Sequence, residues 1–116
     1  MIVGIQASRN FNDYPVFLRA MGTALSMMDK DDPNFYIYSA GPFNLNALAV
    51  EFANVSERNL KLRGISVKFK KIPSSWIKDN ISDIDYFAYF SKPGEGSSDI
   101  VDYADSNGVE VGVYRY

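Results

Sequence analysis

The sequence predicts an α/β fold: a single three-layer, Rossmann-like domain with a five-stranded, mainly parallel sheet in the order 3-2-1-4-5. Two observations support this prediction. Segments with strand patterns alternate with segments of helical periodicity along the chain. The expected strands also differ in their pattern of apolar residues. Residues 2–7, 35–38 and 84–90 are nearly continuous apolar runs, whereas apolar and polar residues alternate in 65–70 and 109–114. Continuous runs are typical of strands buried on both faces, and alternating ones of sheet edges.

Three helices are expected between these strands. Apolar residues recur at helical spacing over residues 16–28, 45–63 and 100–104. Right-handed crossovers then place the first two helices on one face of the sheet and the third on the other. Residues 73–82 are expected to be a connection that contains the only Trp.

The ends of these helices have recognisable signals. Asn12 or Asp13 before Pro15 marks the start of the first helix, as an N-cap followed by Pro in the first turn. Gly64 marks the end of the second helix. Ser97 is expected to cap the third helix, which stops at Gly108.

The composition limits the chemistry that residues 1–116 can perform. Neither Cys nor His occurs, which excludes disulfides, thiolate metal sites, most zinc sites and Ser-His-Asp catalysis. We therefore expect no metal and no cofactor. Any catalysis must rest on Asp, Glu, Arg, Ser or Tyr.

Charge and hydropathy limit the partners. The 12 basic and 14 acidic residues give a net charge of −2, so no basic excess exists to bind duplex nucleic acid along many phosphates. Lys68, Lys70 and Lys71 form a local cluster that is typical of an edge strand protected against aggregation. We find no secretory signal pattern and no apolar run of membrane-spanning length, so we expect a cytoplasmic protein without a membrane partner.

The reversal of winding between the first and fourth strands predicts where a ligand binds. In open parallel sheets the ligand lies outside the carboxyl ends of the strands at this point. Three loops rich in small and hydroxyl residues leave strands there, at residues 7–10, 39–44 and 91–98. Two of them lead into helix N-termini, whose free N–H groups and dipole favour an anion such as a phosphate. The candidate ligand-binding residues are Ser8, Arg9, Gly41, Asn44, Asn46, Lys92, Gly94, Gly96, Ser97 and Ser98.

The same residues could instead have purely structural roles. This alternative makes them helix caps (Ser97 or Ser98, Asn44 and Asn46), a tight turn (Gly94 and Gly96) and a surface ion pair (Arg9 with Asp13). The functional interpretation depends on three such loops meeting at one place.

Several segments resemble motifs of one family. Residues 7–14, ASRNFNDY, resemble the GSRDFTDY opening of the small YspA-like proteins of the SLOG superfamily, and residues 39–49 resemble their GGARGADALA segment. Residues 73–76, PSSW, resemble their PADW, while residues 84–90 and 94–100 resemble ADLVLAF and GGRGTADM. The likeness covers almost the whole chain in the right order.

The resemblance implies a Rossmann-like sheet with a pocket for a nucleotide or a nucleotide-derived ligand. Relatives include sensors of nucleotide signals and the LOG enzymes, which cleave the N-glycosidic bond of nucleoside monophosphates. By this resemblance the binding loops contain Ser8 and Arg9 in the first, Gly41, Asn44 and Asn46 in the second, and Gly94, Gly96, Ser97, Ser98 and Asp99 in the third.

Several charged positions of the family are missing from this chain. The family's Arg in the second loop is Phe43 here, its Asp is Asn46, and the glutamate of the LOG enzymes falls at Ile100. We therefore expect a protein that binds a nucleotide or nucleotide-derived signal without catalysis. One form of this function is sequestration of the signal, as a viral protein directed against host defence would perform.

Two alternatives stay open at this point. A small hydrolase of an N-glycosidic bond, as in nucleoside monophosphates, or of a phosphate bond would use Glu95, Asp99 or Asp79 as the acid, with Arg9 and Lys92 on the phosphate. A protein-interaction module would instead use the excess of tyrosine rings at Tyr36, Tyr38, Tyr86, Tyr89, Tyr114 and Tyr116. Because members of the family often self-associate, a homo-oligomer is also expected.

Overall fold

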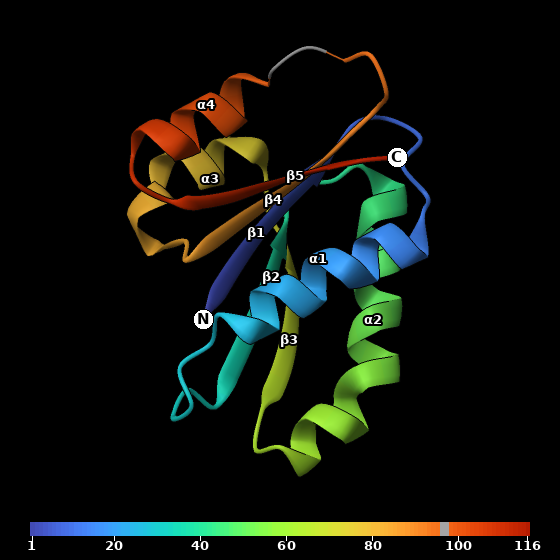
Figure 1. The fold of residues 1–116 in the computed structure, drawn as a ribbon, viewed down its shortest axis with the longest axis vertical. Coiled ribbons are helices and arrows are strands. Elements are labelled where there is room, and N and C mark those ends of the chain that lie inside the picture. Colours follow the sequence, from blue (N-terminus) through green and yellow to red (C-terminus); the bar gives the residue numbers. More distant parts are fainter. Residues whose placement is uncertain (96–97) are drawn as a thin grey trace.

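The computed structural model describes residues 1–95 and 98–116 and contains a five-stranded parallel sheet (Figure 1). The strand order is β3-β2-β1-β4-β5, and all four pairings are parallel. The predicted fold class and strand order are therefore confirmed. The strands are β1 (Ile2–Ala7), β2 (Asn34–Ser39), β3 (Ser66–Lys71), β4 (Tyr86–Ser91) and β5 (Glu110–Arg115).

Helices cover both faces of this sheet, as the right-handed crossovers require. Helices α1 and α2 pack on one face, and α3 and α4 lie on the other (Figure 1). The second pair covers β4 and β5, and α3 also reaches β2, where Trp76 meets Tyr38. The described helices are α1 (Tyr14–Ser26), α2 (Phe43–Leu62), α3 (Ser74–Asp79) and α4 (Asp99–Ser106), with a short 3₁₀ helix at Ile81–Asp83.

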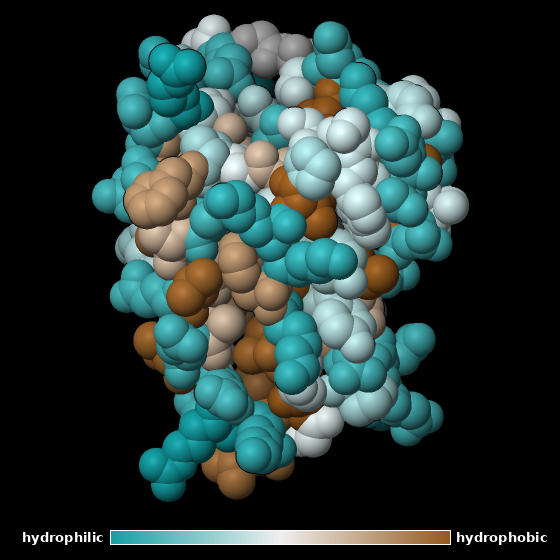
Figure 2. Space-filling model, turned by 180° about the vertical axis from the view of Figure 1, so that it is seen from behind, coloured by the Kyte–Doolittle hydropathy of each residue, from teal (hydrophilic) through white to brown (hydrophobic). Residues whose placement is uncertain are grey.

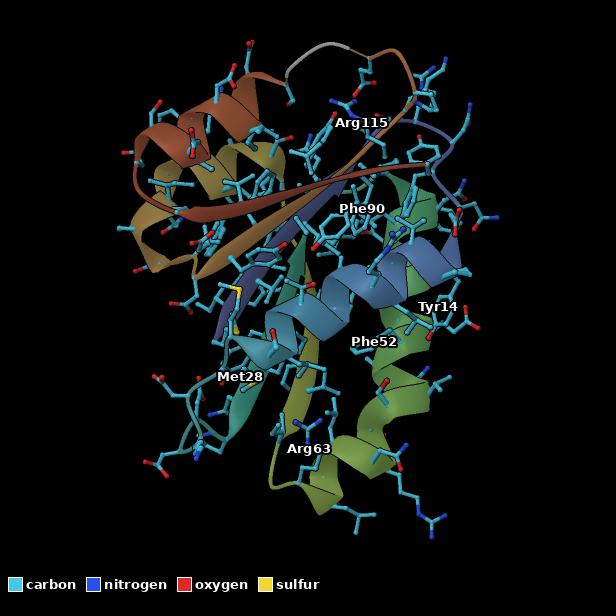
Figure 3. All side chains as sticks on the ribbon, viewed as in Figure 1. Tyr14, Met28, Phe52, Arg63, Phe90 and Arg115 are labelled. Carbon is cyan, nitrogen blue, oxygen red and sulfur yellow. The ribbon has the colours of Figure 1, made fainter. Side chains whose placement is uncertain are left out.

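The larger core lies between the sheet and helices α1 and α2. Phe90 of β4 stacks on Phe11 and Phe17, with ring centroids 4.5 and 5.7 Å apart, and Phe52 meets Phe17 edge-on (Figure 3). All four rings are buried. Each fully buried large apolar side chain contributes roughly 1.5–3 kcal/mol, so this aromatic cluster fixes α1 and α2 against the sheet.

The smaller core lies on the opposite face, under α3 and α4. Its buried members include Ile77 from α3, Phe87 from β4 and Ile100 from α4. Because neighbouring residues of a strand point to opposite faces, β4 supplies Phe90 to one core and Phe87 to the other. This double burial explains the continuous apolar run of the β4 sequence.

The start of α1 agrees with the prediction, and its end differs. The Asp13 carboxylate accepts a hydrogen bond from the Val16 N–H at 3.1 Å, which makes Asp13 the N-cap. The helix ends at Ser26, although helical spacing continues to Met28. Met28 packs against the larger core from a tight turn, in which its N–H bonds to the Leu25 carbonyl.

Two other expectations about the helices need correction or qualification. Residues 73–82 are not a plain connection, because they contain α3 and the start of the 3₁₀ helix. The N-cap position of α4 is Ser98, and its side chain makes no capping hydrogen bond. Ser97, the expected cap, lies outside the described residues. Gly64 ends α2 with a φ of +77°, as predicted.

The edges of the sheet also follow the predicted pattern of apolar residues. Strands β3 and β5 contain no buried residue, whereas β1, β2 and β4 each contain several. On the back of the molecule, apolar patches are interrupted by hydrophilic side chains (Figure 2). Among the helices of the described residues, none has the length and apolar character needed to cross a bilayer.

Candidate functional site

The three predicted loops meet at the carboxyl end of β1. The Ala7 N–H donates to the Gly41 carbonyl of the loop after β2 at 3.1 Å, and the Ser8 N–H donates to the Phe90 carbonyl of β4 at 2.9 Å. The Lys92 N–H, in the loop after β4, donates to the Ser8 hydroxyl oxygen at 3.2 Å. The convergence expected from the strand order is therefore present in the structure.

A hydrogen-bonded group of three side chains lies at the centre of this region. The Ser8 hydroxyl lies 2.8 Å from each carboxylate oxygen of Glu95 and donates to them. The Tyr89 hydroxyl donates to Oε1 of Glu95 at 3.1 Å. Ser8 is buried, and Tyr89 and Glu95 are partly exposed. We call this group the Ser8–Tyr89–Glu95 cluster.

Tyr89 acts as a neutral donor in this cluster. Burial raises the pKa of its hydroxyl above the ordinary value of 10, and the hydrogen bond to Glu95 and the Glu95 charge raise it further. Hydrogen bonds with Ser8 and Ser98 act in the opposite direction. Tyr89 is therefore protonated at neutral pH, and its proton is directed at the carboxylate.

The second loop is held by its own side chains. The Ser39 hydroxyl donates to the Asn46 side-chain oxygen and accepts from the Gly41 N–H. Gly41 has a φ of +88°, which favours glycine. Asn44 is exposed in the first turn of α2, whose N-cap is Pro42 without a side-chain cap, so the interpretation of the two asparagines as caps is wrong. Among the described residues, no hydrogen bond joins them to the cluster.

Three cationic residues lie at the carboxyl ends of β1, β4 and β5. Arg9 and Lys92 are exposed on the first and third loops. No carboxylate of the described residues lies within 4.0 Å of Arg9, so the alternative ion pair with Asp13 does not form. Arg115, at the end of β5, donates from Nη1 to the Ser91 hydroxyl at 2.8 Å and lies at the same end of the sheet (Figure 3).

Gln6 adds a polar group that the sequence analysis missed. Its side-chain oxygen is buried and has no hydrogen-bond partner among the described residues. Gln6 pairs with Tyr89 across β1 and β4, and both side chains point to the face covered by α3 and α4. The sequence does contain a sign of this group, since Gln6 is a polar residue inside an apolar strand. Such a residue merits attention because buried polar groups rarely lack hydrogen-bond partners.

The remaining candidates differ in where they lie. Gly94 is exposed in a turn with a φ of +79°. Gly96 and Ser97 lie outside the described residues. The proposed acids Asp79 and Asp99 lie at the end of α3 and the start of α4, and no hydrogen bond of the described residues joins either to Glu95.

A hollow lies at the opposite end of the strands. It has a volume of about 450 Å³ and lies between the amino ends of β2 and β3 and the last turns of α2. Ligands of open parallel sheets bind at the carboxyl ends of the strands instead. The hydrogen-bonded cluster rather than this hollow therefore defines the candidate site.

Fold and site together define a Rossmann-like α/β protein with a serine–tyrosine–glutamate cluster at the point where the strand order reverses. No family model and no curated protein matches the chain. A crystal structure of Mycobacterium tuberculosis shikimate dehydrogenase is similar, with 8% sequence identity and a TM-score of 0.47. The match covers 96% of this chain and 44% of that chain, so this chain spans less than half of its length.

Proposed function

We propose that this chain binds a nucleotide or nucleotide-derived ligand at the carboxyl ends of β1 and β4 and releases it unchanged. The observation that carries the proposal is the Ser8–Tyr89–Glu95 cluster, which joins two loops at the reversal of the strand order. Ligands of open α/β sheets bind at this position. The resemblance to nucleotide-binding SLOG proteins supports the same ligand class.

Glu95 is suited to hold the ribose of such a ligand. An ionised carboxylate offers about four acceptor sites, and the hydroxyls of Ser8 and Tyr89 use only part of them. The two neighbouring hydroxyls of a ribose can donate to the others. Dinucleotide-binding sheets use an acidic residue on the ribose hydroxyls in the same way.

The rim of the site is suited to the phosphate. Arg9, Lys92 and Arg115 bring three positive charges to the ends of β1, β4 and β5. Arg and Lys form charge-assisted hydrogen bonds with phosphate oxygens, and Arg can bind two of them at once.

Binding without catalysis is the form of the function that the geometry supports best. Glu95 already accepts hydrogen bonds from two hydroxyls, and no hydrogen bond of the described residues joins Asp79 or Asp99 to it. Phe43, which stands where the family has an Arg, is 80% exposed at the start of α2 and brings no charge to a phosphate. Sequestration of a signalling nucleotide would need only binding of this kind.

The ligand class is tested by releasing whatever the protein carries. We expect gentle purification, denaturation and mass spectrometry to yield an intact nucleotide in stoichiometric amount. A free base or a ribose phosphate would instead favour the hydrolase alternative. An empty protein whose melting temperature no nucleotide raises would contradict the proposal.

The role of Glu95 is tested by pairing a variant with a modified ligand. Glu95→Gln removes a charge-assisted acceptor, so we expect affinity for the ligand found above to fall about ten-fold or more. Glu51→Gln, which alters an exposed carboxylate on α2, is the matched control and should bind normally. A 2′-deoxy ligand should bind more weakly than the ribose form to the wild-type protein but not to Glu95→Gln. Equal loss in both proteins would show that Glu95 does not hold the ribose.

A further inference from the structure

The basic residues of this acidic protein are concentrated in one segment. Residues 58–78 hold seven of the 12 Lys and Arg residues and none of the 14 Asp and Glu residues. This segment includes the end of α2, the edge strand β3 and most of α3. A charge asymmetry of this kind within one chain suggests contact with a polyanion. Arg58 and Lys61 belong to α2, so only part of this charge lies on any one face of the sheet.

The sheet register places two of these lysines beside tyrosines. Tyr36 and Tyr38 of β2 pair with Lys68 and Lys70 of β3. Because side chains alternate along a strand, all four point to the same face of the sheet. This is the face opposite α1 and α2, since Val67 and Phe69 pack against the larger core.

Aromatic rings lie close together on this face. The ring centroids of Tyr36 and Tyr38 are 6.1 Å apart, and Trp76 of α3 meets Tyr38 edge-on at 5.1 Å. The Lys70 ammonium lies 5.8 Å from the centre of the Tyr38 ring. We call Tyr36, Tyr38, Lys68, Lys70 and Trp76 the tyrosine–lysine platform.

The platform is accessible to a partner. Lys68 and Lys70 are exposed, and the three aromatic residues are partly exposed. On this face α3 reaches β2 where Trp76 meets Tyr38, and in the described part of the chain no residue of β3 packs against the smaller core under α3 and α4. Tyr38 and Trp76 pack partly against the smaller core, and Tyr36, Tyr38 and Trp76 all keep part of their surface in solvent.

We propose that the tyrosine–lysine platform binds single-stranded nucleic acid. Unpaired bases stack on aromatic side chains, and neighbouring lysines neutralise the phosphates; together these contacts bind single strands with little sequence preference. A duplex hides the faces of its bases, and the net charge of −2 does not favour duplex binding over many phosphates. The platform lies apart from the Ser8–Tyr89–Glu95 cluster, so this inference does not depend on the proposed function.

The single Trp gives a direct measure of binding. Trp76 is the only Trp in the chain, so its fluorescence should change in a saturable way when a short oligothymidylate or oligouridylate is added. The apparent affinity should fall as salt is raised. We expect a duplex of the same length to bind at least about ten-fold more weakly, because its bases cannot stack on the rings.

Variants separate the platform from general electrostatics. Lys68→Gln and Lys70→Gln should each weaken binding and reduce the salt dependence by about 0.7 in the log–log slope. Lys71→Gln changes a lysine on the other face of the same strand and should alter affinity less than about two-fold. Tyr36→Leu should weaken binding about five-fold or more, whereas Tyr36→Phe keeps a ring and should bind normally. Melting temperatures of all variants confirm that they fold.

Three results would overturn the proposal. One is the absence of saturable binding to either oligonucleotide at low salt. Another is equal binding of polyphosphate or anionic vesicles, which would mean a basic surface that reads no bases. The third is an equal effect of Lys71→Gln and Lys70→Gln, or of Tyr36→Leu and Tyr36→Phe.

Discussion

A contact between single residues fixes how β5 packs against β4. The hydroxyls of Tyr86 and Tyr114 lie 2.6 Å apart above Gly112 of β5. A Cβ at Gly112 would lie 1.9 Å from the Tyr86 hydroxyl oxygen and 2.8 Å from the Tyr114 ring. Glycine is therefore required here by a close approach of two rings rather than by backbone conformation.

Gly112→Ala should destabilise the protein, because the tyrosine pair must separate or β5 must shift. We expect a loss of about 2–4 kcal/mol in the free energy of unfolding, from overpacking and the broken hydrogen bond. Gly22→Ala is the control, since a Cβ there meets nothing within 4 Å and Gly22 lies inside α1. It should stabilise by about 0.5–1 kcal/mol. Urea unfolding measures both, and equal effects would contradict this account.

The same tyrosine pair predicts a dependence of stability on alkaline pH. Burial, followed by the hydrogen bond and charge of Tyr114, raises the pKa of Tyr86 well above its ordinary value of 10. The unfolded chain therefore loses this proton at lower pH than the folded protein. The stabilising contribution is present below pH 10 and is lost as the pH rises toward the folded value.

This dependence is measured by urea unfolding on both sides of pH 10. Between about pH 9 and about pH 11, the free energy of unfolding should fall more steeply for the wild-type protein than for Tyr86→Phe. Absorbance titration of the tyrosines should show one fewer late-titrating group in the variant. Identical slopes would mean that Tyr86 ionises as freely in the folded state as in the unfolded chain.

Two polar residues show the limit of prediction at the residue scale. The loops of Ser8 and Lys92 were predictable because a topological rule locates the carboxyl ends of the strands. The strand neighbour of Gln6 and the hydrogen-bond partner of Arg115 were not, because they depend on the register of β1 and β5 against β4 and on side-chain conformation. Local sequence patterns contain neither.

At the scale of elements, the pattern of apolar residues in the strands was sufficient to predict their order in the sheet. Burial on both faces makes β1 and β4 nearly continuous apolar runs, and in the exposed edge strands β3 and β5 apolar and polar residues alternate. Helix α3 was missed because its six residues, SSWIKD, are too few to show helical periodicity. Its position follows from tertiary packing, since Ile77 is fully buried in the smaller core.

The N-cap of α1 gives a prediction at this scale. Asp13→Ala removes the acceptor of the Val16 N–H and leaves that donor without a partner in the protein. We expect a loss of about 1 kcal/mol in the free energy of unfolding. Asp13→Asn retains a capping oxygen and should lose much less. Equal destabilisation by both substitutions would mean that the charge of Asp13 matters rather than its capping bond.

At the scale of the whole molecule, the two ends of the parallel strands carry different features. The three loops and the cationic residues lie at the carboxyl ends of the strands, and the hollow beside α2 lies at their amino ends. The two cores on opposite faces hold these loops in position. Self-association into a homo-oligomer and a cytoplasmic location stay predictions, and sedimentation of the purified protein tests the first.

The location of the ligand is the central claim and is tested most directly by NMR. We expect titration of the ¹⁵N-labelled protein with nucleotides to move the amide signals of Ser8, Arg9, Lys92 and Glu95 first, in a saturable way. Signals of residues at the amino ends of the strands, such as Gly64 and Ser66 at the opposite edge of the molecule, should not move. Shifts confined to that edge, or no shift with any nucleotide, would contradict a nucleotide site at the carboxyl ends of β1 and β4.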